Sequence, residues 1–170
     1  LADEFGYAVA PTPTCEVGGE RVSSTRIRKA LGQADFEAAT RLLGRPFEMS
    51  GRVQHGQKLG RQLDTPTANI ALHRIRSPLQ GVYVVNVSGA GLSEVAGVAN
   101  VGVKPTFGSS LEATLEAHVL EGSPDLYGQR LTVRFVHKLR DEKKFPSLDA
   151  LKAGIAADKA NARAWLRNHG

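Results

Sequence analysis

Apolar residues recur at every second position along most of the chain, which is the spacing of strands that bury one face. Six strands at short intervals, with turn residues and no helix between them, predict an antiparallel sheet that closes into a barrel. The last run is expected to keep its alternation from Leu131 through Leu139. The predicted strands lie within residues 47–53, 67–72, 81–88, 94–101, 111–121 and 131–139.

Helical spacing replaces the alternation near the N-terminal end. Ser24 is expected to cap a short helix that Gly32 ends, and Asp35 to cap a second helix that Gly44 stops. Residues 24–43 therefore predict a helical hairpin.

The C-terminal end predicts a further helix. Ser147 is its expected cap, and Leu151 and Ile155 lie at helical spacing on one apolar stripe that Trp165 extends. Asp158 is expected to begin a second helical piece. The fold class is thus mainly β: a six-stranded antiparallel barrel with an N-terminal helical hairpin and a C-terminal helix.

Composition restricts the class of protein. The chain has 170 residues, enough for one domain with an appendage, and no apolar run approaches the roughly 20 residues that span a bilayer. The single cysteine, Cys15, excludes an internal disulfide and favours a reducing, cytoplasmic compartment. No signal-peptide pattern is present, and a first residue that is leucine suggests that the chain starts inside a longer gene product. The net charge of +5 suits anionic partners such as nucleotides or nucleic acid.

A glycine-rich stretch begins at Gly51. Gly56 and Gly60 flank Lys58, and Arg61 follows, so backbone that approaches a ligand closely alternates with cations that suit a polyanion. The spacing fails the P-loop pattern, because glutamine stands where that pattern requires lysine, and a strand follows where a helix is needed.

The same stretch continues into the sequence PTANI. In a strand, Thr67 and Asn69 point to one face, and their hydroxyl and amide oxygens are hard ligands of the kind that magnesium takes beside nucleotide phosphates. Two interpretations fit this spacing. One is a phosphate cradle followed by a metal-positioning pair, and the other is a glycine-rich hairpin with a polar edge strand.

Two further regions carry candidate chemistry. Glu116 lies in mid-strand and can accept a proton from a hydroxyl that attacks phosphorus, although the alternation alone favours a solvated glutamate on the outer face, and His118 beside it is expected at the surface. Residues 98–108 are expected to form an irregular loop, in which Asn100 and Thr106 offer polar groups; a plain hairpin connection fits equally well. Phe107 in the same loop offers a ring for stacking a planar ligand or packs in the core.

These motifs occur together in one known family. GQKLGRQL, PTANI, GVYVV, GVANVGVKPTFG, LEAHVLEG, DLYG and LRDEKKFPSLDALK appear in the order in which they occur in bacterial bifunctional riboflavin kinase/FMN adenylyltransferases, over roughly residues 46–158. The chain resembles the kinase half of that family, and residues 1–44 resemble the end of the adenylyltransferase domain. VSSTRIR matches that domain's ATP-phosphate motif, but its histidine motif is absent, so FAD synthesis is not expected from this chain.

The resemblance implies a Greek-key barrel over residues 45–170 that transfers the γ-phosphate of ATP to riboflavin, giving FMN and ADP. It implies that Thr67 and Asn69 position Mg²⁺ and phosphates near the mouth of the barrel, opposite Glu116 as the base. The nucleotide-wrapping and ligand-shaping positions that it implies are Gly56, Lys58, Gly60, Arg61, Asn100, Thr106, Phe107 and Arg140.

The chain departs from the family at one point. Asp64 stands where the family usually has glycine, and Thr65 where it has an aromatic residue, so weaker nucleotide or flavin affinity with retained activity is expected. A second hypothesis is a basic β-barrel that binds single-stranded nucleic acid without catalysis, although its strands lack the surface aromatics of a stacking platform. Under a third, residues 1–44 serve only for docking.

Overall fold

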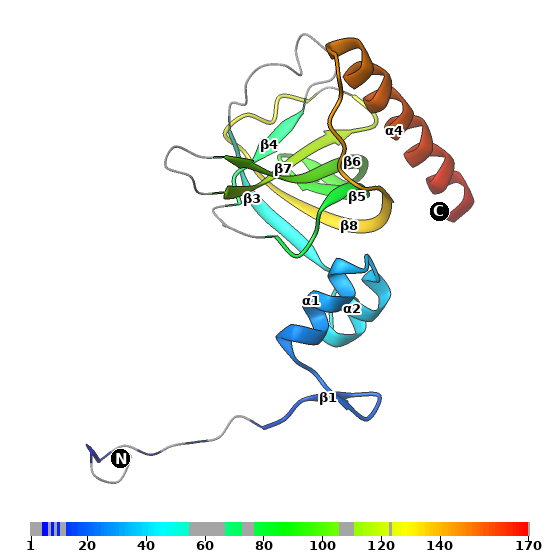
Figure 1. The fold of residues 1–170 in the computed structure, drawn as a ribbon. Helices are drawn as coiled ribbons and strands as arrows, with labels where there is room; N and C mark the ends of the chain where they lie inside the picture. The colour runs from blue at the N-terminus through cyan, green and yellow to red at the C-terminus, as the bar shows by residue number, and fades with distance from the viewer. Residues whose placement is uncertain are drawn as a thin grey trace.

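The computed structural model describes residues 5–6, 8, 10, 13–54, 67–72, 77–105, 111–122 and 124–169. Its centre is a closed barrel of six antiparallel strands (Figure 1). Around the barrel the order is β3-β4-β7-β6-β5-β8, and β8 closes on β3. The predicted barrel is confirmed, and the placement of β4 beside β7 gives it a Greek-key crossover. The strands are β3 (Glu48–Gln54), β4 (Ala68–Ile70), β5 (Gly81–Gly89), β6 (Leu92–Pro105), β7 (Leu111–Val119) and β8 (Arg130–Arg140).

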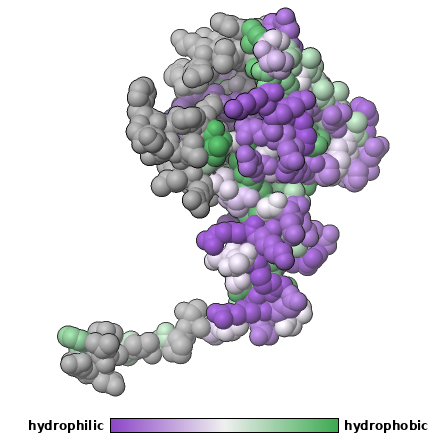
Figure 2. Space-filling model, viewed as in Figure 1, coloured by the Kyte–Doolittle hydropathy of each residue, from purple (hydrophilic) through white to green (hydrophobic). Residues whose placement is uncertain are grey.

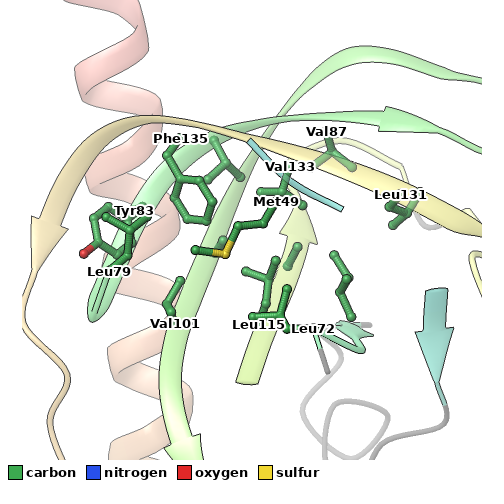
Figure 3. Packing of buried hydrophobic residues seen from close by; sticks show 14 of the residues in the cluster. Met49, Leu72, Leu79, Tyr83, Val87, Val101, Leu115, Leu131, Val133 and Phe135 are labelled. Atoms are coloured by element: carbon green, nitrogen blue, oxygen red, sulfur yellow. The ribbon is translucent and has the colours of Figure 1, made fainter. Parts of the chain in front are cut away.

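The barrel interior is filled by side chains. Met49, Leu115 and Leu131 are almost completely inaccessible to solvent and converge from three different strands (Figure 3). They come from the inward-facing positions that the alternation predicts, as β3 shows by burying every second residue. The interior is therefore a packed core.

The alternation predicted for β8 is wrong beyond Phe135. Two register shifts interrupt its pairing with β5, so that Lys138 and Arg140 lie opposite the neighbouring residues Tyr83 and Val82. Such bulges insert a residue and turn the following side chains to the other face. The outcome is that Leu139 packs in the cluster beneath the C-terminal helix, outside the barrel.

Strand β6 is longer than expected. It runs without a break through the segment predicted as an irregular loop, so Asn100 lies in mid-strand. The expectation of a loop from residue 98 is therefore wrong up to residue 105, and residues 106–110 lie outside the described part of the chain.

One continuous helix, α4 (Leu148–His169), covers the outer face of β5, β6 and β8 (Figure 1). It begins where predicted, because the Ser147 hydroxyl accepts a hydrogen bond from the Ala150 amide at 3.1 Å. Asp158 does not begin a second piece; it lies within the same helix. A second apolar cluster, centred on Val84 and Ala162, fills the space between helix and sheet and explains why β5 is buried on both faces.

The N-terminal region forms a two-stranded ribbon, β1 (Glu16–Val17) and β2 (Glu20–Arg21), followed by the predicted helical hairpin of α1 (Ser24–Gly32) and α2 (Phe36–Leu43). The cap of α1 is one residue earlier than predicted, because the Ser23 hydroxyl accepts from the Arg26 amide. The second cap is confirmed: the Asp35 carboxylate accepts from the Ala38 amide at 2.9 Å. Gly44 ends α2 in the left-handed conformation, also as predicted.

The helical hairpin lies against one end of the barrel (Figure 1). The ring of Phe36 meets those of Tyr83 and Phe135, with centroids 5.9 and 6.3 Å away, so one core runs from the hairpin into the barrel. Hydrophilic side chains cover α1 and α2 on the face seen in Figure 2. Among the described helices, none combines the length and apolar character needed to cross a bilayer.

Candidate functional site

A row of directly paired residues crosses five neighbouring strands. Glu116 in β7 lies opposite Asn69 on one side and Asn100 on the other. Asn100 in turn lies opposite Val82, and Val82 opposite Arg140 at the end of β8. Directly paired residues point to the same face of an antiparallel sheet. The fold therefore gathers side chains from positions far apart in the sequence on one surface.

This surface is the outer face of the barrel. Ala68, Ala117 and Ala99 alternate with the row, and all three are buried in the barrel core. The expected position near the barrel mouth is corrected accordingly: Glu116 and Asn69 project outward. Glu116 is only half-buried, as an outer-face residue should be, but it is not freely solvated because it lines a cavity.

The cavity lies between the outer sheet face and the first half of α4, and its volume is about 180 Å³. Its polar wall includes Thr67, Asn100 and Glu116, three of the predicted site residues. Asn69 is not among the lining residues, although it is paired with Glu116. The apolar or helix-borne part of the lining comprises Val82, Val98, Phe145, Leu151, Ile155, Asp158 and Lys159. The sheet side of the cavity combines polar groups with Val82 and Val98, and the helix side combines aliphatic with charged residues. Such a mixed lining suits a ligand that has both a flat hydrophobic part and a polar tail.

Arg140, another predicted site residue, is held by contacts within the protein. Its Nε and Nη2 each donate to one carboxylate oxygen of Asp158, both at 2.7 Å, and its Nη1 donates to the Asp141 carbonyl at 2.9 Å. The guanidinium carbon lies 5.7 Å from the centroid of the Phe145 ring. Arg140 thus joins the end of β8 to the middle of α4 at the edge of the cavity.

Further lining residues were not predicted as part of the site. Asp158 and Lys159 follow Leu151 and Ile155 at helical spacing, so the stripe that marked the buried face of α4 also marked the cavity wall. Burial, and next the charge of Arg163, lower the pKa of Lys159 below its ordinary value. His118 was expected at the surface, and it lines the cavity instead.

Six predicted ligand-shaping positions lie outside the described residues, and their predictions stay open. They are Gly56, Lys58, Gly60, Arg61, Thr106 and Phe107.

The described residues contain no group of three or more histidine, cysteine, aspartate or glutamate side chains placed to hold a metal ion. Thr67 and Asn69 supply neutral oxygen donors instead, beside the carboxylate of Glu116. Such a set fits a cation that keeps several waters and is shared with phosphate oxygens, as magnesium does in nucleotide sites.

Comparison with known proteins identifies the family of this chain. The family model of riboflavin kinase (Flavokinase) matches residues 43–166. A bifunctional riboflavin kinase/FMN adenylyltransferase from Pseudomonas fluorescens is 57% identical over 94% of this chain and 51% of that protein. The protein of the same name from Escherichia coli K12 is 46% identical over 96% of this chain and 52% of its own length. The chain thus spans about half the length of these curated relatives.

Solved structures with the same fold include a riboflavin kinase from Trypanosoma brucei, which is 27% identical with a TM-score of 0.52 over 73% of this chain and 82% of that one. A structure described as a macrolide-efflux protein from Streptococcus pneumoniae is 35% identical with a TM-score of 0.75, over 91% of this chain and 50% of that one. These matches favour the kinase hypothesis over the nucleic-acid-binding barrel. From the family match and the barrel together, the chain belongs to the riboflavin kinase family.

Proposed function

We propose that this chain transfers the γ-phosphoryl group of ATP to the ribityl 5′-hydroxyl of riboflavin, giving FMN and ADP. The observation that carries the proposal is the cross-strand row, which places Glu116 between Asn69 and Asn100 on the outer sheet face with Thr67 in the same cavity. Phosphoryl transfer needs positioning and charge neutralisation more than covalent help, and these residue types provide both.

Glu116 is proposed as the general base. Its carboxylate takes the proton of the 5′-hydroxyl while that oxygen bonds to the γ-phosphorus. The bond between the γ-phosphorus and the bridging oxygen breaks, and ADP leaves with that oxygen. A half-buried position in the cavity lining allows the carboxylate to meet a substrate hydroxyl, while the aliphatic residues Leu151 and Ile155 of α4 keep bulk water away.

Thr67 and Asn69 are proposed to orient the phosphates and a divalent cation, taken to be Mg²⁺. A bound magnesium ion would supply charge neutralisation on the phosphate oxygens. Thr67 lines the cavity directly, and Asn69 of β4 lies beside Glu116 in the row. A hydroxyl and an amide oxygen are thus both available on the β4 side of Glu116.

The apolar residues of the cavity lining are proposed to receive the flavin ring. Val98, Leu151 and Ile155 present aliphatic side chains toward the cavity, and the Phe145 ring closes one side. Asn100 is proposed to bind the polar part of the same ligand.

The arrangement of the longer protein also stays a proposal. Residues 1–44 are proposed as the end of an adenylyltransferase domain, and residues 45–170 as the kinase domain, because the curated relatives are named for both activities. A cytoplasmic location is proposed from the single cysteine.

The test is FMN formation by the purified chain from riboflavin and Mg-ATP, followed by chromatography. Glu116→Gln should lower kcat by about 10²–10⁴-fold, the usual contribution of a positioned base. Glu112→Gln is the matched control, because Glu112 is exposed on the same strand. Turnover near that of the parent in Glu116→Gln would remove Glu116 as the base, and no FMN from the parent chain would refute the proposed function.

A further inference from the structure

Asp158 is unusual for a charged residue in this protein. At 6% exposure, it is the only polar or charged residue that is buried within the described part of the chain. A carboxylate is buried at such a position only when a counter-charge and hydrogen bonds compensate it. Arg140 provides both, through two parallel hydrogen bonds of 2.7 Å.

The pair connects the two walls of the cavity. Arg140 stands at the last position of the cross-strand row that contains Glu116, and Asp158 stands on α4 one turn beyond Ile155. The position of Arg140 on the outer face depends on the register shift in β8, which sets Arg140 opposite Val82. The helix is therefore fixed to the sheet at the level of the proposed base.

All three guanidinium nitrogens of Arg140 are engaged by Asp158 and the Asp141 carbonyl. The Phe145 ring packs beside the guanidinium and against the backbone of Gly154 in α4. The arginine is thus oriented toward the helix. These contacts indicate that Arg140 holds α4 and the Phe145 ring in place.

We propose that Arg140 and Asp158 form a positioning pair that sets the width of the cavity between α4 and the sheet, and so the affinity for the flat part of riboflavin. This inference rests on the proposed function and assigns Arg140 an indirect part, in place of direct contact with phosphate. Loss of Arg140 leaves the Asp158 carboxylate buried and unpaired, so the helix must move to hydrate it. Loss of the Asp158 charge removes the ion pair that holds the partly exposed Arg140 side chain against the helix.

The experiment compares Asp158→Asn, Arg140→Gln and the double variant in the full chain. Riboflavin affinity is measured directly by the quenching of riboflavin fluorescence, and kcat and the KM for ATP by FMN formation. Each single variant should weaken riboflavin binding at least tenfold while kcat and the KM for ATP stay within about threefold of the parent. The double variant should bind no more weakly than the worse single variant, because interacting residues are not additive.

Asp149→Asn is the matched control, since Asp149 is an exposed carboxylate in the first turn of α4 and should leave the affinity unchanged. If Asp158→Asn does not fold, Asp158→Glu keeps the charge and lengthens the side chain by one methylene. Its circular dichroism should match the parent while riboflavin binding weakens severalfold.

The positioning pair is overturned if Asp158→Asn or, in its place, Asp158→Glu binds riboflavin as the parent does. It is also overturned if the effects of the two single variants multiply, or if Arg140→Gln raises the KM for ATP without changing riboflavin affinity, as a phosphate contact would. A parent chain that neither binds riboflavin nor forms FMN would refute the proposed function and this inference together. If the parent chain forms FMN and the variants bind riboflavin as tightly as the parent, the positioning pair alone is refuted.

Discussion

Replacement of Gly51 by alanine tests how tightly the barrel is packed beside the proposed metal-positioning residues. Gly51 lies in β3 with its hydrogen pointing into the barrel. A Cβ there would lie 2.2 Å from the carbonyl oxygen of Ala71 and 2.8 Å from the Cγ2 atom of Ile70. The first of these atoms belongs to the backbone directly after β4, so no side-chain rotation relieves the contact.

The size of the effect follows from this geometry. Relief requires a shift of about 1 Å between β3 and the end of β4, and overpacking of a filled core costs about 1–3 kcal/mol. A value near 3 kcal/mol is expected because the obstacle is backbone. For a chain of this size, that corresponds to a fall in Tm of roughly 6–12 °C.

The assay is thermal and urea unfolding of the parent, Gly51→Ala and the control Gly32→Ala. Gly32 ends α1, and its added Cβ would meet no atom closer than 4.0 Å, so alanine should leave Tm unchanged or raise it slightly. The urea m-value should stay constant while the midpoint of Gly51→Ala falls.

A second readout links the core to the site. In the described residues, β4 pairs with β3 through Val53 with Ile70 and Gln54 with Asn69. A shift of β4 therefore also moves Asn69 relative to Glu116. FMN formation by Gly51→Ala should fall about tenfold at temperatures where the variant is folded. A Tm equal to that of the parent would show that the barrel is not tightly packed at Gly51. A lowered Tm with the activity of the parent would show that this packing does not position Asn69 for catalysis.

Two further predictions concern α4. Gly154→Ala would set a Cβ 2.3 and 2.4 Å from two carbons of the Phe145 ring, so the ring should swing into the cavity and weaken riboflavin binding severalfold, measured by fluorescence quenching; stability should change little, because the helix gains about 1 kcal/mol of propensity. Burial, and next the charge of His169, lower the pKa of His137, whose ring stacks on the single tryptophan, Trp165, at 5.0 Å. A lowered folded-state pKa means that the unfolded chain binds the proton first, so stability should fall as pH drops through about 6.5, and His137→Asn should reduce the difference in urea midpoint between pH 7.5 and 5.5.

The strands were predictable because the barrel core imposes period two on every strand that faces it. In β7, the apolar positions Leu115, Ala117 and Val119 alternate with polar ones, and the structure buries all three. The alternation also assigned Glu116 to the outer face correctly. It gave no information on what covers that face, and the cover decides whether a glutamate is solvated or lines a cavity.

The end of β8 was not predictable from its pattern. His137 and Leu139 continue the alternation of Leu131 to Phe135, and nothing in their identity marks the two register shifts that turn this segment around. The Arg140–Asp158 pair depends on those shifts, because the pairing of Arg140 with Val82 is a property of the folded sheet. The sequence likewise does not reveal that Asp158 is buried in its helix or that Arg140 is its partner.

The filled interior explains why the candidate site must lie outside the barrel. A six-stranded barrel whose centre holds Met49, Leu115 and Leu131 has no room for a flavin or a nucleotide. An outer sheet face alone would expose a base to bulk water, where its interactions with a developing charge are weak. Helix α4 provides the missing wall, and the apolar outer positions of β5 anchor it. The chemistry proposed for Glu116 therefore depends on residues of α4 that lie more than 30 positions further along the chain.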